Sequence, residues 1–149
     1  MMLNFRGRRR ALIALALSFG VTLLAVTTTT AWAQDPRITE AQRVAREWLA
    51  LSDAGDTKAS YAAASPKFRG TMTPEQWEKA SVAARGPYGA VKQRSLAASQ
   101  ASLQVPNLPD GTYVLLMYRT SFANRDASET ITMEREADGV WRLVGYSIR

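Results

Sequence analysis

The segment TYVLLMYRTSFA, residues 112–123, has apolar side chains at both sets of alternating positions. Successive side chains of a β-strand point to opposite faces of the sheet, so this strand is apolar on both faces, as is typical of a strand inside a sheet. One set is Val114, Leu116, Tyr118 and Phe122, and the other is Tyr113, Leu115 and Met117. We therefore predict a central strand here.

Turn residues separate this segment from three others in which apolar and polar residues alternate. The other segments are 91–105, 130–134 and 140–149, and the turns lie at 107–111, 124–126 and 138–139. Asp138-Gly139 is typical of a tight hairpin. Because short turns connect antiparallel neighbours, the pattern predicts a four-stranded antiparallel sheet.

Ahead of the strands, apolar residues recur at helical spacing in three segments. These segments are 38–52, 56–64 and 73–84, and they are expected to end at Gly55, Pro66 and Gly86-Pro87. Asp56 and the capping box Thr73-Pro74-Glu75-Gln76 mark two of the starts. The order predicts an α+β domain, residues 34–149, with three N-terminal helices packed on one face of the sheet.

Residues 1–33 have the pattern of a secretory signal peptide. Four arginines, Arg6 and Arg8 to Arg10, precede an apolar run at 11–26, and the segment ends in Ala31-Trp32-Ala33. This pattern predicts cleavage after Ala33, a periplasmic or secreted protein, and membrane contact only through this segment. An uncleaved anchor would need about 20 apolar residues. The paired arginines leave general and twin-arginine export both open.

The charge and composition exclude several classes of function. The net charge of +6 falls to +2 without residues 1–33, which hold four of the 19 basic residues and none of the 13 acidic ones. We therefore expect no nucleic-acid partner. The chain has no histidine and no cysteine. A Ser-His-Asp triad, a cysteine nucleophile and a Cys/His zinc site are thus excluded, and we expect no cofactor and no metal.

Several short clusters together resemble the bacterial domain-of-unknown-function family 4019. They are Trp48–Asp56, Arg85–Val91 with Arg94, Pro109–Val114, Glu129-Thr130 and Asp138–Tyr146. The resemblance implies a small exported protein and supplies no activity. The order of elements also resembles cystatin-like and nuclear-transport-factor-like (NTF2-like) cones, in which a curved sheet wraps a helix. Such folds host unrelated functions.

Glu129 is the most informative carboxylate in the sequence. Alternation places it on the same face as Ile131 and Met133, toward the helices. A carboxylate in that position must be paired or protonated, since burying an isolated charge is expensive. It is either a general base or ligand anchor, or one half of a structural ion pair.

Arg85 and Arg94 are the candidate partners of Glu129 or of an anionic ligand. Arg85 belongs to the last turn of a predicted helix, where the helix dipole favours a cation. Alternation places Arg94 on the outward face of its strand unless a bulge shifts the register. A purely structural role remains open for both. Asp53 and Asp56 lack the spacing of a calcium loop, and helix termination and recapping explain them.

Aromatic side chains complete the set of candidates. Trp77 either lines a pocket for a flat ligand or packs in the core. Tyr118 and Tyr146 could each donate a phenol to an enolate, and for an enzyme of that kind Glu129 with Tyr118 on the neighbouring strand is the candidate pair.

The expected function is a non-catalytic exported module that binds a small ligand or a protein partner. One alternative is an acid/base enzyme, an isomerase or hydrolase that uses Glu129 with Tyr118 or Arg85. Another is a homodimer formed through a sheet face, because the segment 112–123 is apolar on both sides.

Overall fold

The computed structural model describes residues 35–149. The helices are α1 (Pro36–Asp53), α2 (Thr57–Ala63), α3 (Pro66–Arg69) and α4 (Pro74–Arg85), followed by the 3-10 helix η1 (Gly86–Tyr88). The strands are β1 (Val91–Ser102), β2 (Thr112–Phe122), β3 (Asp126–Arg135) and β4 (Trp141–Ile148). The predicted signal peptide and its cleavage after Ala33 lie outside the described residues. Within them, no helix is both long and apolar enough to cross a membrane.

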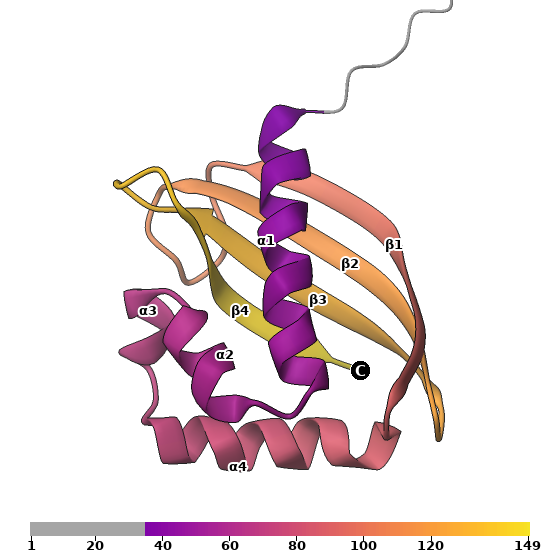
Figure 1. Ribbon diagram of the computed structural model, residues 1–149. Coiled ribbons are helices and arrows are strands. Elements are labelled where there is room, and N and C mark those ends of the chain that lie inside the picture. Colours follow the sequence, from indigo (N-terminus) through magenta and orange to yellow (C-terminus); the bar gives the residue numbers. More distant parts are fainter. Residues whose placement is uncertain (1–34) are drawn as a thin grey trace, which may run out of the picture. The chain divides into compact units, whose positions relative to one another are not determined.

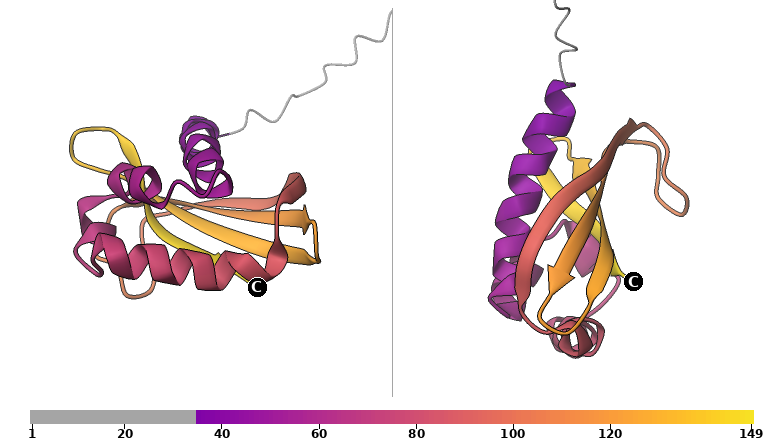
Figure 2. Two further views of the ribbon diagram at one scale, coloured as in Figure 1. Left: turned by 60° about the horizontal axis from the view of Figure 1, so that its bottom comes forward. Right: turned by 90° about the vertical axis from the view of Figure 1, so that its right-hand side faces the viewer.

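The four strands form one antiparallel sheet in the order β1-β2-β3-β4. Helix α1 lies across one face of this sheet and contacts all four strands (Figure 1). Figure 2 shows that no helix of the described chain crosses the opposite face, which we call the outer face. The α+β class, the antiparallel sheet and the central position of β2 are confirmed.

The helical part differs from the prediction by one short element. Pro66 was expected to end the second helix, but it begins α3. Ser65 caps this helix by accepting a hydrogen bond from the Phe68 backbone N–H at 3.0 Å. Proline has no N–H and so costs little in a first helical turn. The three predicted helices correspond to α1, α2 and α4, and the described chain contains a fourth, the four-residue α3, which the prediction missed.

The core lies between α1 and the inner face of the sheet. Fully buried side chains of β2, β3 and β4, including Leu116, Ile131 and Leu143, meet Trp48 and Leu49 of α1 there. The indole N–H of Trp48 donates to a backbone carbonyl of α2 at 2.9 Å. This contact ties the two helices together through a buried polar group that has its partner.

Strand β1 contains two irregularities that change which side chains face inward. The register with β2 shifts between Val91 and Gln93 and again between Leu96 and Ala98. Each bulge adds one residue to β1 and reverses the alternation that follows it. Arg94 consequently points inward and not outward, which is the exception that the sequence left open for a bulge.

Candidate functional site

Glu129 lies on the inner face of β3 and has no exposed surface. Its Oε1 accepts hydrogen bonds from Arg85 Nη1 at 3.1 Å and from the Tyr146 hydroxyl at 2.7 Å. Its Oε2 accepts from Arg94 Nε at 2.7 Å and from the Thr120 hydroxyl at 2.5 Å. Each carboxylate oxygen thus has two donors, which is about its full capacity.

Asp53, the last residue of α1, holds the same two arginines from the other side. Its carboxylate binds Arg94 through two bonds, Nη1 to Oδ2 at 2.7 Å and Nη2 to Oδ1 at 2.9 Å. Arg85 Nη2 adds a bond to Oδ1 at 2.5 Å. The Asp53 side chain is 26% exposed, whereas the two arginines are 12% and 14% exposed. Asp53 therefore forms the solvent side of the cluster.

We call this group the Glu129 cluster; it comprises Asp53, Arg85, Thr120, Arg94, Glu129 and Tyr146. Its members come from α1, α4 and all four strands. Two carboxylates face two guanidinium groups, so their formal charges cancel. Buried charges are tolerated where they are paired and hydrogen-bonded in this way.

The local sequence explains how two of these side chains reach the cluster. Arg85 ends α4, where its charge also meets the negative end of the helix dipole. Tyr146 lies opposite Ile131 on the neighbouring strand β3, two residues along from Glu129. Its hydroxyl accepts from Arg85 Nη1 at 2.7 Å and donates its own proton to Glu129 in a second hydrogen bond.

The cluster shifts the proton affinity of its own members. Burial, and then the nearby charge of Glu129, raise the pKa of Tyr146 far above its usual range. Burial alone would lower the pKa of Arg94, but its bonds to Asp53 and Glu129 outweigh burial and raise that pKa. Both side chains therefore keep their protons across the physiological range.

The chemistry open to Glu129 follows from its four bonds. A general base must offer a free lone pair to the proton that it removes. Here each oxygen of Glu129 is occupied twice, so accepting a substrate proton would first require the loss of a charge-assisted bond. Among residues 35–149 there is also no group of three or more acidic side chains placed to hold a metal ion.

Tyr118 does not form the expected pair with Glu129. The two residues are directly opposite each other on β2 and β3. The Tyr118 hydroxyl is nevertheless buried without a hydrogen-bond partner in the described chain. Burial raises the pKa of this phenol. The phenol that contacts Glu129 belongs to Tyr146 instead.

Trp77 lies in the core and takes no part in the Glu129 cluster. It is 5% exposed, and its indole N–H donates to the Ser60 hydroxyl at 3.0 Å. The ring of Phe68 packs edge-on against it at 5.2 Å between centroids. Of the two roles considered for Trp77, core packing matches this environment.

Asp53 and Thr120 are cluster members that were not identified from the sequence. Helix termination explains Asp56, which caps α2 by accepting from the Ala59 N–H at 2.8 Å, but Asp53 points to the arginines instead. Thr120 could have been found, since alternation along β2 already places a hydroxyl on the inward face. No local pattern marks Asp53, because its partners lie 32 and 41 residues away.

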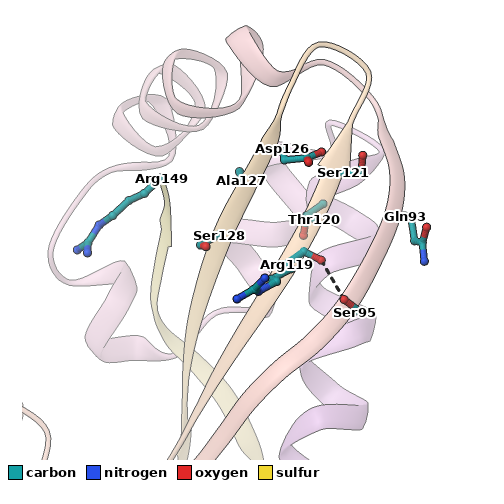
Figure 3. Close-up of a pocket in the computed structure, with 9 residues that line it drawn as sticks. All are labelled: Gln93, Ser95, Arg119, Thr120, Ser121, Asp126, Ala127, Ser128 and Arg149. Atoms are coloured by element: carbon teal, nitrogen blue, oxygen red, sulfur yellow. Dashed lines mark hydrogen bonds between the residues drawn. The ribbon is translucent and has the colours of Figure 1, made fainter.

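A cavity of about 510 Å³ lies on the outer face, near the β2–β3 hairpin (Figure 3). It is lined by Gln93, Ser95, Arg119, Thr120, Ser121, Asp126, Ala127, Ser128 and Arg149. None of the candidate residues predicted from the sequence lines it. Thr120 belongs to both sites, because its side chain reaches Glu129 on the inner face while the residue borders the cavity.

Comparisons with known proteins give a family and no activity. A family described as "Protein of unknown function (DUF4019)" matches residues 44–146. No curated protein matches the sequence. The solved structure of Aln2 from a Streptomyces species is similar with a TM-score of 0.48 and 17% identity, over 78% of this chain and 92% of that one. A likeness at that level carries no conclusion about this chain.

Proposed function

This chain belongs to the DUF4019 family of proteins of unknown function, and we propose that it is an exported, non-catalytic binding module. Its ligand site, in this proposal, is the cavity on the outer face of the sheet. The observation that carries the proposal is the cavity itself: a polar hollow on the face that no described helix covers. Concave sites with a few convergent polar groups are where proteins commonly hold small molecules.

The state of Glu129 supports a non-catalytic role. The acid/base alternative needs Glu129 to exchange a proton with a substrate, together with Tyr118 or Arg85. All four acceptor positions of Glu129 are occupied, and Arg85 is itself held by Asp53. Structural ion-pair networks produce the same combination of burial and charge as catalytic sites. In this network the residues of the cluster already fill every acceptor position of Glu129, which supports a structural role.

Two further parts of the proposal concern export and the finer fold. Export to the periplasm or the medium rests on the signal-peptide pattern of residues 1–33, with cleavage after Ala33. We also assign the domain to the cystatin-like or NTF2-like cones. A long helix packed across an antiparallel four-stranded sheet supports this assignment.

Native mass spectrometry of the full chain, expressed with its own N-terminal segment and recovered from the periplasm without refolding, tests this proposal. We expect a protein that begins at Gln34 and carries extra mass that is lost on denaturation. A bare monomer would contradict the small-ligand proposal and direct the search to protein partners. Retention of residues 1–33 on a cell-associated protein would contradict export with cleavage.

A second copy of this chain is the competing occupant of the outer face. Met117, in the middle of β2, points outward and is 48% exposed. Exposed apolar side chains at such a position favour association between sheets. Native mass spectrometry also distinguishes a bound ligand from a second copy of the chain. A homodimer that dissociates in a Met117→Lys variant would assign the outer face to self-association.

A further inference from the structure

We propose that the outer-face cavity binds an oxyanion, a carboxylate or a phosphate group, between Arg119 and Arg149. This inference rests on the proposed function and adds to it the chemical class of the ligand. It also predicts which end of the cavity holds the negative charge.

The register of the sheet places four cavity residues in one row across the strands. Ser95 lies opposite Arg119, and Arg119 lies opposite Ser128. Ser128 and Arg149 exchange backbone hydrogen bonds of 2.8 and 3.0 Å. Neighbouring strands are about 4.8 Å apart, so the Cα atoms of the two arginines are separated by roughly 10 Å. A serine fills the position between them.

The small side chain of Ser128 leaves the space between the arginines open. In Figure 3 the Arg119 side chain extends toward Ser128, whereas Arg149 starts on the far side of that serine and its guanidinium is directed away from it. A guanidinium presents its N–H groups in a planar fork that matches two oxygens of a carboxylate or phosphate. Arg149 is exposed, so rotation of its side chain toward Ser128 would place one such fork on each side of a hydroxyl donor and surround one oxyanion.

Neither arginine is engaged elsewhere in the described part of the chain. Arg119 and Arg149 are exposed, and no side-chain hydrogen bond or ion pair involves either guanidinium within residues 35–149. Arg85 and Arg94, in contrast, are bound by two carboxylates each. The positive charge in the cavity is therefore available to a ligand.

A second row of cavity residues, next to the first, carries a negative charge instead of positive ones. Gln93 lies opposite Ser121, and Ser121 lies opposite Asp126. Asp126, when ionised, can only accept hydrogen bonds and repels an oxyanion. It lies two residues along β3 from Ser128, about 7 Å away in an extended strand. This polarity fits a small polar acid whose hydroxyl or ammonium group points to Asp126.

The Glu129 cluster holds the floor of this site in place. Thr120 and Glu129 point inward from β2 and β3 and are joined by a 2.5 Å hydrogen bond. The residues next to them in sequence, Arg119 and Ser128, point outward on the same two strands. Because the backbone under the cavity is already rigid, ligand binding would lose less conformational entropy than at a flexible site.

The test is a titration of the exported protein with inorganic phosphate and, separately, with citrate, followed by nuclear magnetic resonance at low ionic strength. Arg119→Gln and Arg149→Gln are the test variants. Arg46→Gln is the matched control, because Arg46 is exposed on α1, across the sheet from the cavity. Comparing the phosphate titration with the citrate titration shows whether the site prefers a phosphate group or a carboxylate.

We expect saturable binding of at least one probe, with shifts at Ser95, Ser121 and Ser128. Each test variant should weaken it by about tenfold, the usual loss of one charge-assisted contact. Arg46→Gln should stay within about twofold, since a distant exposed charge is largely screened. Asp126→Asn should strengthen phosphate binding, because it removes a repelling charge. Ser128→Asp should abolish binding while the fold is retained.

Two results would overturn the inference. One is equal affinity in Arg119→Gln, Arg149→Gln and Arg46→Gln, and the other is the absence of saturable binding of either probe. If native mass spectrometry still finds a bound molecule, the binding module stands and only its ligand class is wrong. If no molecule co-purifies and neither probe binds, both the proposed function and this inference fail.

Discussion

The hydroxyl of Tyr146 donates a hydrogen bond of 2.7 Å to Oε1 of Glu129, across the β3–β4 pair. The same hydroxyl accepts from Arg85, so the phenol links a carboxylate to a guanidinium. Tyr118, although directly opposite Glu129 on the other side, contributes no hydrogen bond. The two tyrosines therefore differ in energetic role although both lie on neighbouring strands beside one carboxylate.

Glu129→Gln should lower the free energy of unfolding by about 3–5 kcal/mol, the usual cost of removing one partner from a buried ion pair. The substitution leaves Arg85 and Arg94 facing the single carboxylate of Asp53. Urea unfolding followed by circular dichroism measures the change. Glu47→Gln, at an exposed pair on α1, is the control and should change stability by less than about 0.5 kcal/mol. Similar small changes in both variants would show that the cluster contributes little stability.

Asp53→Asn should also destabilise the protein, but by less than Glu129→Gln, about 1–3 kcal/mol. Asp53 is 26% exposed, so water replaces part of what the arginines lose. Asp110→Asn, in the exposed β1–β2 loop, is a control for the same chemical change. Thermal unfolding of both variants gives the comparison. A larger loss in Asp53→Asn than in Glu129→Gln would contradict the order of burial.

Tyr118→Phe and Tyr146→Phe should have different effects at neutral pH. Tyr146→Phe removes two hydrogen bonds and should cost about 1–3 kcal/mol, because Arg85 and Glu129 each lose a partner. Tyr118→Phe removes a buried hydroxyl that has no partner in the described chain, and stability should stay constant or rise. Chemical unfolding of both variants tests this. A clear loss in Tyr118→Phe would mean that its hydroxyl is satisfied in solution.

The pKa of Tyr146, raised by burial and by Glu129, predicts the response to alkaline pH. In the unfolded chain the phenol ionises near its usual pKa of about 10. The unfolded state therefore releases the proton first, so stability is unaffected well below that value and falls as the pH rises above it. Unfolding measured in urea at a series of alkaline pH values should show this decline.

Tyr146→Phe should reduce the slope of that decline without abolishing it. The pKa values of Tyr113 and Tyr118 are also raised by burial, so two such phenols remain in the variant. An unchanged slope in Tyr146→Phe would contradict the assigned proton affinity. The comparison is made on the slope alone, since the variant starts from a lower stability at neutral pH.

Several features followed from the sequence because they are local. The apolar residues on both faces of 112–123 predicted a central strand, and β2 covers 112–122. The capping box at Thr73 and Gln76 predicted the start of α4, and both of its hydrogen bonds are present. Alternation also placed Glu129 on the inward face of β3. In each case the deciding pattern involves residues close together in the chain. It can therefore be recognised from the order of the residues alone.

The sequence already named Glu129 with Arg85 and Arg94 as candidate partners, but tertiary structure alone decided the other contacts of the cluster and the row of residues in the cavity. Arg94 faces inward because bulges in β1 reverse its alternation, and a composition pattern carries no information on where a bulge falls. Asp53 meets Arg94 across 41 residues, through the packing of α1 against the sheet. The row of Arg119, Ser128 and Arg149 depends on strand register. Alternation determines which face a residue occupies, whereas its neighbours across the sheet are set by hairpins, bulges and packing together.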